Sequence, residues 1–527
     1  MIRHYFRLML PWLALGLAVT GCKVGPTYQR PCAELTETWK DPHDKLDSRI
    51  NQGDMDTLQW WKLFNDPLLN QLIGYAAHQN LNVQIAAYRI LEARATSRMK
   101  SADLLPEVRG KGYYVDELLS FATLDVGLLS FLPPTLKIGR EQEIFDFEFD
   151  VSWEVDLFGH TSLEIAALMA DTQSLQDHQR DILVTLYGDV ARYYFEVRTL
   201  QELYSIVSNS LESQSSTATV VASRFEAGLS TYFDSVRANA QVATTRARLP
   251  VLETQLVRSM HRLAVLLGYQ PNALRELLAV KVPLPELPLD IPIGIPSELL
   301  LRRPDIRQAE RELAASTERI GVAVAEFFPR LSFTGQGGWN SNFLNALTLG
   351  TSQMWQVNPV VTLPIFNAGR LKANLRAQNA RQKQALLHYW DVVLNSLEEV
   401  ENSLVSFSLE LVHNRDLKEA AENHKQANDL ALDLHLHGLT DFLSVLEAQR
   451  TWLLAMEDYM QSLRSLFEDL VVLYRALGGG WQVDPFQPAE EGCLPALCAP
   501  EMDSQAYSIS TPEISTPENS TEECIYD

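Results

Sequence analysis

The chain has 527 residues, a formal net charge of −23 and five cysteines. Nucleic-acid phosphates are bound by clustered lysine and arginine, which this acidic chain does not show, so a nucleic-acid partner is excluded. Apart from the N-terminal leader, no segment reaches 18 apolar residues. A transmembrane helix is therefore not expected, and any bilayer crossing would have to use strands.

Residues 1–21 are typical of an export signal, because a basic start is followed by the short apolar run Leu8–Val19. Small residues then precede Cys22, as they do at a bacterial lipoprotein processing site. We expect Cys22 to become the lipidated N-terminus of a periplasmic segment, residues 22–60. An ordinary signal peptide with a chance cysteine is the alternative. Lys23, in place of the aspartate that favours inner-membrane retention, is typical of outer-membrane lipoproteins.

Two alternating segments follow a helical pattern that runs from Trp60 to about Asp103. They are Glu107–Tyr114 and Phe145–Leu157, within a strand region at about 106–158. In the second, seven apolar or aromatic residues alternate with six polar ones, most of them acidic. This pattern favours a strand with lipid on one side and water on the other. A half-buried strand of a soluble protein is the alternative.

A long helix is predicted from Thr161 to Glu226, where the pattern contains no proline. At 1.5 Å per residue it would be roughly 100 Å long, far beyond a globular average. A return helix from Tyr232 to about Leu267 and a proline-rich connector, Val282–Pro296, follow. These elements make up a first repeat, residues 61–296.

The second half of the chain repeats the first. Gly228–Asn239 and Gly438–Gln449 resemble each other at a constant offset of 210 residues. In each copy glycine can end one helix in the left-handed conformation, and the following Ser230 or Thr440 can cap the next helix. The pattern predicts two helical hairpins, with tips at about 227–231 and 437–441.

The second repeat, residues 297–480, has the same order of elements as the first. We expect a helix at Ser297–Ala325, strands at about 329–366, a long helix at Gly369–Leu436 and a return helix to Leu477. The composition changes after this point. The tail, residues 481–527, has ten acidic residues and no Lys, Arg or His, which predicts disorder.

Cysteines are absent from all of the long helical patterns, so the fold is not expected to depend on disulfides. Besides Cys22 there are four, of which three lie in the tail and the fourth is Cys32. A disulfide within the tail is an open alternative in an oxidising periplasm.

Several motifs resemble those of the outer membrane efflux proteins, the TolC-like exit ducts, and specifically the lipoprotein branch that serves resistance-nodulation-division pumps. The motifs are Leu300–Glu310, Ile320–Ala323, Phe328–Pro329, Trp153–Gly159 and Leu363–Arg370. The resemblance extends from Cys22 to Gly480 and leaves the tail outside. His160 stands where the family usually has arginine.

The resemblance implies an α+β fold of two internal repeats. Four strands per chain would join those of two other chains in a trimeric, 12-stranded transmembrane β-barrel, continued by a long α-helical coiled-coil tunnel in the periplasm. The cost of unpaired backbone groups also favours closure of the barrel, because a four-stranded sheet alone would leave two unpaired edges in lipid.

The implied function is an outer membrane exit duct of a tripartite efflux pump. It would passively conduct drugs or other small molecules from an inner-membrane pump and a periplasmic adaptor to the outside, with no enzymatic activity and no cofactor besides the lipid on Cys22. The implied partners are two further copies, the adaptor, the pump and outer membrane lipid. The alternatives are the outer membrane channel of a type I protein secretion system and a coiled-coil scaffold without a pore.

The resemblance also implies site residues. The tips would contact the adaptor through Gly228, Leu229, Ser230, Gly438, Leu439 and Thr440. A periplasmic aperture would be formed by Leu443 as an apolar constriction, Glu447 as an acidic ring and Asp234 as a latch between neighbours. Leu443 and Glu447 are one helical turn apart and share a face.

Two features depart from the family pattern or add to it. His435 and Thr440 replace the Tyr and Arg that partner the latch in some members. His413, His424 and His435 recur every 11 residues, which suits a right-handed helical supercoil better than a metal-conducting stripe, so no metal site is predicted.

Overall fold

The structure is a computed structural model that describes residues 23–31, 39, 50–51, 57–118, 141–288, 291–293 and 296–481. The predicted signal segment, Cys22 and the acidic tail after Trp481 lie outside the described residues. So does most of the segment between Pro31 and Thr57.

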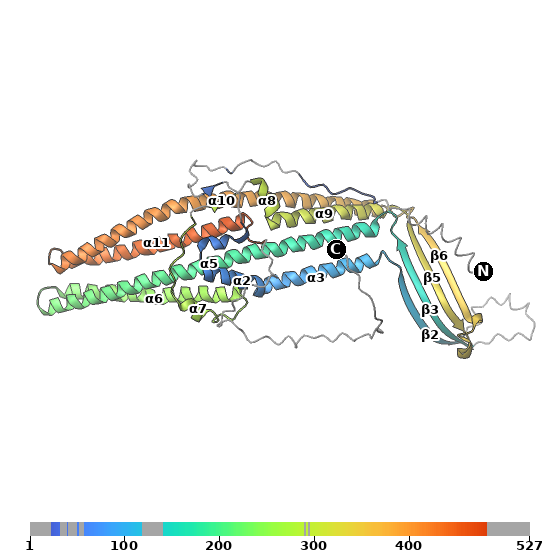
Figure 1. The fold of residues 1–527 in the computed structure, drawn as a ribbon, viewed down its shortest axis with the longest axis horizontal. Coiled ribbons are helices and arrows are strands. Elements are labelled where there is room, and N and C mark those ends of the chain that lie inside the picture. Colours follow the sequence, from blue (N-terminus) through green and yellow to red (C-terminus); the bar gives the residue numbers. More distant parts are fainter. Residues whose placement is uncertain are drawn as a thin grey trace, which may run out of the picture.

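The molecule is elongated, with a four-stranded sheet at one end and two helical hairpins that reach the other (Figure 1). The strands are β1 (Ile50–Asn51), β2 (Glu107–Leu118), β3 (Glu141–Val155), β4 (Ile291–Pro292), β5 (Arg330–Ser341) and β6 (Gln353–Thr362). The α-helices are α2 (Pro67–Gln79), α3 (Leu81–Ala102), α5 (His160–Glu226), α6 (Tyr232–Leu266), α7 (Arg275–Ala279), α8 (Pro296–Arg302), α9 (Pro304–Ala325), α10 (Arg370–Leu436) and α11 (Phe442–Ala476). Three 3-10 helices are η1 (Thr57–Phe64), η2 (Leu344–Ala346) and η3 (Gly350–Ser352).

The large sheet is antiparallel throughout, in the order β2-β3-β5-β6. Each repeat contributes one strand pair, and the two pairs join where β3 lies beside β5, with Phe147 opposite Trp339. The prediction of four strands per chain is confirmed. A separate two-residue parallel pairing of β1 with β4 lies outside this sheet.

The two hairpins are equal in length. Helices α5 and α10 each have 67 residues, and α6 and α11 each have 35. Both long helices follow a glycine in the left-handed conformation, Gly159 with φ 81° and Gly369 with φ 85°. A glycine suits both positions because a Cβ would be strained there. The internal duplication inferred from the sequence is thus confirmed.

Three predicted element bounds were wrong. The pattern from Trp60 to Asp103 is broken into η1, α2 and α3. Asp66 caps the start of α2, and the Asn80 side chain accepts hydrogen bonds from the backbone of Asn82 (2.9 Å) and Val83 (3.3 Å) and so starts α3. The helix predicted at 297–325 is broken at Arg303, since the following proline disfavours helical geometry there. Strand β6 ends at Thr362, short of the predicted 366.

The main hydrophobic core lies midway along the molecule, where η1 and α2 cover α5 and α11 (Figure 1). Trp60 of η1 stacks on Tyr474 of α11 with ring centroids 5.2 Å apart. Phe195 of α5 stacks on Phe467 of α11 at 4.6 Å. Aromatic pairs of this kind contribute beyond their buried area, so this cluster holds the first hairpin against the second.

Candidate channel surface and periplasmic tips

The large sheet has one apolar and one polar face, because residues opposite each other across antiparallel strands share a face. The register assigns these side chains to the apolar face: Val108, Tyr114, Phe147, Phe149, Val151, Trp153, Phe333, Trp339, Trp355, Val357 and Val361. The polar face carries Arg109, Lys111, Asp146, Glu148, Asp150, Glu154, Gln336, Asn340, Gln356 and Asn358.

The apolar face is uncovered in the single chain. Phe147 is 43% exposed and Trp355 is 81% exposed. A soluble half-buried strand would place these side chains against a core. An exposed apolar band opposite an acidic face is what a membrane-spanning strand needs, with lipid on one side and water on the other.

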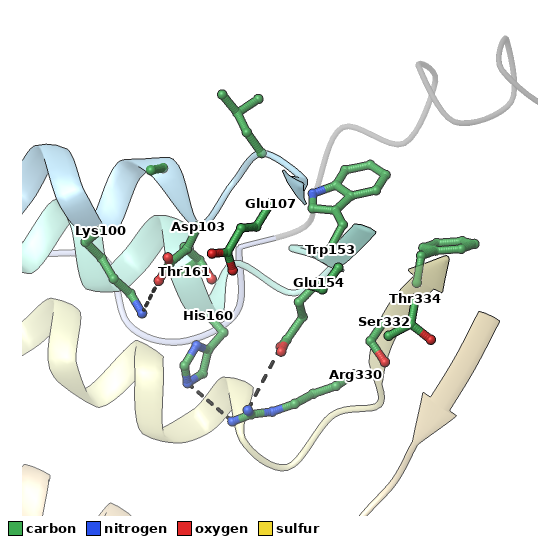
Figure 2. Close-up of a pocket in the computed structure, with 14 residues that line it drawn as sticks. Lys100, Asp103, Glu107, Trp153, Glu154, His160, Thr161, Arg330, Ser332 and Thr334 are labelled. Carbon is green, nitrogen blue, oxygen red and sulfur yellow. Dashed lines mark hydrogen bonds and ion pairs between the residues drawn. The ribbon is translucent and has the colours of Figure 1, made fainter. Parts of the chain in front are cut away.

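The ends of the strands meet the helices at a polar junction, a groove of about 620 Å³ (Figure 2). Trp153 and Glu154 leave β3 in opposite directions, and the Trp153 indole donates a hydrogen bond to the carbonyl of Leu104 (2.9 Å). Arg330 of β5 reaches down to the His160 ring (3.4 Å) and to Glu154 (3.9 Å). Arg330 of β5 therefore supplies a positive charge at this junction, and His160 at the start of α5 supplies the imidazole that it contacts.

The described N-terminal segment, residues 23–31, runs from this junction along α9. The Val24 amide donates to the carbonyl of Phe158 (3.4 Å), directly after β3. Farther along, a Cβ on Gly25 would lie 2.6 Å from the Cα of Gly321, so the two backbones touch and position 25 requires glycine. Lys23 therefore lies at the strand ends, where its backbone and side chain approach Gly159.

Each hairpin turns at a left-handed glycine, Gly228 with φ 74° and Gly438 with φ 73°. The sequence misplaced the N-caps of the return helices by one residue: they are Thr231 and Asp441. The turn after glycine needs two more residues before the next helix begins, so Ser230 instead donates its hydroxyl hydrogen bond back to the carbonyl of Val221 (3.2 Å).

The two return helices use the same pair of cap groups in reversed order. In the first, the Thr231 hydroxyl donates to the Asp234 carboxylate three residues later (2.7 Å). In the second, the Ser444 hydroxyl donates to the Asp441 carboxylate three residues earlier (2.6 Å). Hydrogen bonds from the Ser444 hydroxyl and backbone lower the pKa of Asp441. Asp234 thus has a partner within its own chain.

The leucines beside the turn glycines are exposed, Leu229 by 77% and Leu439 by 73%. Between the two tips, Arg224 near the end of α5 donates hydrogen bonds to the C-terminal end of α10. Its guanidinium contacts the His435 ring (3.2 Å) and the carbonyls of His435 (3.3 Å) and Leu436 (3.1 Å). A cation at these terminal carbonyls also complements the helix dipole. Arg224 therefore couples the two hairpins where they end.

Leu443 and Glu447 lie on one exposed face of the first turns of α11, as predicted from their spacing; Leu443 is 50% exposed. Arg450 donates to both Glu447 oxygens, at 2.8 and 3.1 Å, and this pairing raises the pKa of Arg450. Arg237 of α6 lines the same shallow groove of about 230 Å³. The acidic side chain is therefore accompanied by two guanidinium groups.

The residues at the equivalent positions of the first repeat are Phe233 and Arg237, 210 residues earlier. There the guanidinium lies 4.3 Å from the centroid of the Phe233 ring, which makes a cation–π contact. The two hairpins thus carry different side chains at equivalent positions, an aromatic ring and a cation in the first and an apolar chain and a carboxylate in the second.

The motif that carries the family resemblance has a structural role at the junction of α8 and α9. Arg303, with a side chain only 9% exposed, forms ion pairs with Asp305 (2.6 Å) and Glu399 of α10 (2.8 Å). It also donates to the carbonyl of Ala476 at the end of α11 (2.7 Å). One side chain therefore joins α9, α10 and α11.

No helix among the described residues is both long and apolar enough to span a bilayer. They also contain no group of three or more His, Cys, Asp or Glu side chains arranged to hold a metal ion. Of the three histidines spaced by 11, His435 is engaged by Arg224 and by the carbonyl of Thr440 (3.1 Å).

A sheet with one lipid-compatible and one polar face, continued by paired helices of 67 residues, defines a membrane channel with a helical extension. The sequence model of the family described as "Outer membrane efflux protein" matches residues 72–269 and 295–479. The chain belongs to this family. It is an outer membrane channel protein of the kind that serves tripartite efflux pumps, and not an enzyme.

Relatives match along nearly their whole length. The chain is 31% identical over 495 residues to the toluene efflux pump outer membrane protein TtgF of Pseudomonas putida, covering 90% of this chain and 98% of that protein. It is 28% identical over 480 residues to the cation efflux system protein CusC of Escherichia coli O6:H1, covering 90% and 99%. The solved structure of the outer-membrane channel OprN superposes with a TM-score of 0.78 at 31% identity, covering 88% and 100%.

Sequence reasoning missed the groups that hold the site together. Arg224, Arg237 and Arg450 are ordinary arginines within helical patterns, and nothing in their spacing indicates their partners. The cap exchange left a signal, because a hydroxyl residue and an aspartate stand three residues apart in both copies. The close approach of Gly25 to Gly321 joins positions almost 300 residues apart, which a single sequence does not reveal.

Proposed function

We propose that three copies of this chain close into one 12-stranded β-barrel and one helical tunnel, through which small molecules pass from an inner-membrane pump and a periplasmic adaptor to the outside. The observation that carries the proposal is the two-faced sheet. Its outer strands, β2 and β6, each pair on one side only, so the described sheet has two open edges. In lipid such edges would leave backbone groups unpaired, and pairing β6 with β2 of the next copy removes them.

The mass of the detergent-solubilised protein tests this assembly. We expect native mass spectrometry to give three times the mass of one lipidated chain, stable to dilution, because barrel closure satisfies backbone hydrogen bonds at every protomer boundary. A monomer as the dominant species in a mild detergent that keeps the native circular dichroism would contradict the trimer.

We infer that the N-terminus is anchored in the same membrane by lipid on Cys22. The contact of Val24 with the strand end supports this, because it brings the start of the mature chain to the rim of the sheet, where the inner leaflet would lie. The anchor would add to the barrel and would leave residues 23–31 on the outside of the tunnel.

Replacing Cys22 with serine is expected to remove the lipid and leave the signal segment uncleaved by the lipoprotein route. The mass of the N-terminal peptide measures both effects, and Cys32→Ser serves as the matched control. An unmodified Cys22 at the N-terminus of the wild-type protein, or in a chain cleaved elsewhere, would contradict lipidation.

We propose that the tips bind the periplasmic adaptor through Gly228, Leu229 and Ser230 of the first hairpin and Gly438, Leu439 and Thr440 of the second. The exposed leucines support this, because an apolar side chain that is exposed to water at a turn is stabilised when a partner protein buries it. The two tips present the same backbone turn, so one adaptor surface could fit both.

Polar replacement of the tip leucines is expected to weaken adaptor binding. Leu229→Ser with Leu439→Ser should weaken it by about a hundredfold, because burying each leucine contributes on the order of 1.5 kcal/mol and a tenfold change in affinity corresponds to about 1.4 kcal/mol. Surface plasmon resonance with the periplasmic adaptor of the same pump would measure the change. Leu430→Ser, at an exposed leucine on α10 away from the turn, is the control. Equal losses in control and tip variants would remove the tips from the interface.

We propose, finally, that Leu443, Glu447 and Asp234 form the periplasmic aperture. Leu443 narrows the tunnel, Glu447 with Arg450 sets its charge, and Asp234 fixes the first turn of α6 against which the aperture closes. Since the tunnel lumen contacts whatever the pump delivers, we assign no substrate selectivity to the channel beyond this ring.

A further inference from the structure

A basic groove of about 480 Å³ lies between α5 and α9, where the N-terminal segment crosses them. Its charged lining residues are Arg30, Asp177, Arg180, Arg307, Glu310 and Arg311. The four arginines come from three separate parts of the chain, and their side chains are between 33% and 42% exposed. The groove is therefore open to a ligand that approaches from solvent.

The carboxylates of the groove do not balance its arginines. Asp177 accepts from Arg180 (2.5 Å) and from Arg307 (3.2 Å). Glu310 likewise pairs with both other arginines, at 3.1 and 2.5 Å. Four guanidinium groups thus share two carboxylates, which leaves two positive charges in a chain whose formal net charge is −23. Such a site favours a ligand with several carboxylates or phosphates.

The last described residue lies in this arginine cluster. The Trp481 ring has the Arg180 guanidinium 4.8 Å and the Arg307 guanidinium 5.0 Å from its centroid, and its indole nitrogen donates to the carbonyl of Arg302 (2.8 Å). Cation–π contacts with two arginines hold the Trp481 ring against the groove. The residues that follow, 482–527, carry ten acidic side chains and no basic one.

The groove belongs to one protomer. Helices α3, α5, α9 and α10 lie side by side in that order, so α5 and α9 are the inner pair and any boundary with another copy falls at α3 or α10. Residues 23–31 lie on the same surface of α9. Under the proposed lipidation of Cys22 this surface faces outward, away from the tunnel lumen.

We propose that the acidic tail after Trp481 folds back onto this groove, with its carboxylates pairing to Arg30, Arg180, Arg307 and Arg311. The first tail carboxylate, Asp484, is three residues beyond Trp481 and so within about 10 Å of it. Attachment at Trp481 gives the tail an effective concentration in the millimolar range, which an untethered anion of the same chemistry does not have. The tail is thereby held outside the tunnel.

Proteolysis of the full-length trimer by a protease that cleaves after glutamate tests the docking. Cleavage at Glu501, Glu513 and Glu518, followed by mass spectrometry, is expected to be slow in the wild type and several-fold faster in Arg180→Gln with Arg311→Gln. It should also be faster in Asp484→Asn with Glu490→Gln and Glu491→Gln, which changes only the tail and leaves the groove intact. Arg415→Gln with Lys418→Gln, on the exposed face of α10, is the charge-matched control and should cleave like the wild type.

Two outcomes would overturn the proposal. Equally fast cleavage in the wild type, the groove variant and the tail variant would mean that the tail does not bind. Slow cleavage that is unchanged in both variants but becomes fast in high salt would mean that the tail binds elsewhere on the protein. The groove would then not be the docking site of the tail.

Native cysteines supply a second measurement on the same chain. Cys32 is two residues after Arg30, and the tail carries Cys493 and Cys498. With the thiol oxidant diamide, which is reduced to its hydrazine as two thiols form a disulfide, we expect trypsin to release peptide 24–40 linked to peptide 476–527. The link should fall several-fold in Arg180→Gln with Arg311→Gln. Disulfides among tail cysteines alone, in wild type and variant alike, would contradict docking beside Arg30.

Discussion

Replacing Leu443 and Glu447 together with alanine is expected to raise the single-channel conductance of the trimer roughly threefold, as the constriction at the periplasmic end widens. Leu443 is half exposed on the start of α11, and three copies would meet on the tunnel axis under the proposed assembly. Truncation to alanine removes three apolar side chains from the narrowest point and the carboxylates one turn farther along.

The internal duplication provides the matched control for this experiment. Phe233→Ala makes the change equivalent to Leu443→Ala in the first hairpin, at a residue that the aperture proposal leaves out of the constriction, so the conductance should change much less. Planar bilayer recordings of protein shown to be trimeric measure both. Equal conductance in wild type and both variants would place the gate elsewhere, and no conductance in any of them would remove the pore.

Ion selectivity tests the charge of the aperture separately. Arg450 forms an ion pair with Glu447, so Arg450→Ala is expected to increase the preference for cations, whereas Glu447→Ala should reduce it. The reversal potential in a salt gradient measures the preference. A shift in the same direction for both variants would show that the Glu447–Arg450 pair does not set the selectivity.

Replacing Arg303 with alanine is expected to destabilise the protein by roughly 2 kcal/mol, since it removes a buried side chain and leaves a helix-terminal carbonyl and the partly exposed carboxylates of Asp305 and Glu399 without their partner. The Arg303 side chain is 9% exposed and contacts three helices, so the loss would loosen the middle of the molecule and not only one turn. The midpoint of thermal unfolding, followed by circular dichroism of the detergent-solubilised trimer, measures the effect.

Arg302, the preceding residue in the same motif, is the control. Its ion pair with Glu298 (3.0 Å) is partly exposed, and such pairs contribute about 1 kcal/mol or less. Arg302→Ala should therefore shift the unfolding midpoint much less than Arg303→Ala. Similar shifts for the two variants would show that burial of Arg303 is not what makes the motif structurally important.

Much of the fold could be predicted because its signals are periodic and long. The alternation around Phe147 is local to one strand, and the helical pattern from Thr161 to Glu226 is uninterrupted by proline. The duplication then supplied the second half of the architecture from the first. The family resemblance added the number of copies, which no periodicity within one chain contains.

The missed features depend on contacts between distant residues or on one-residue offsets. The break at Asn80 depends on a side chain that caps α3 and at the same time donates to the carbonyl of Leu266 (2.8 Å), in another helix. The position of the caps at Thr231 and Asp441 depends on how many residues the turn after glycine needs. Among candidate site residues, the spacing of Leu443 and Glu447 predicted their shared face, but not the arginines beside them.

The reversed caps of the return helices also determine where each tip carries its negative charge. In the first hairpin the carboxylate belongs to Asp234, within the first turn of α6, whereas in the second it belongs to Asp441, at the cap of α11. Both positions lie at the positive end of a helix dipole, which stabilises a carboxylate. The duplicated tips therefore share a backbone turn but differ by three residues in the position of one charge.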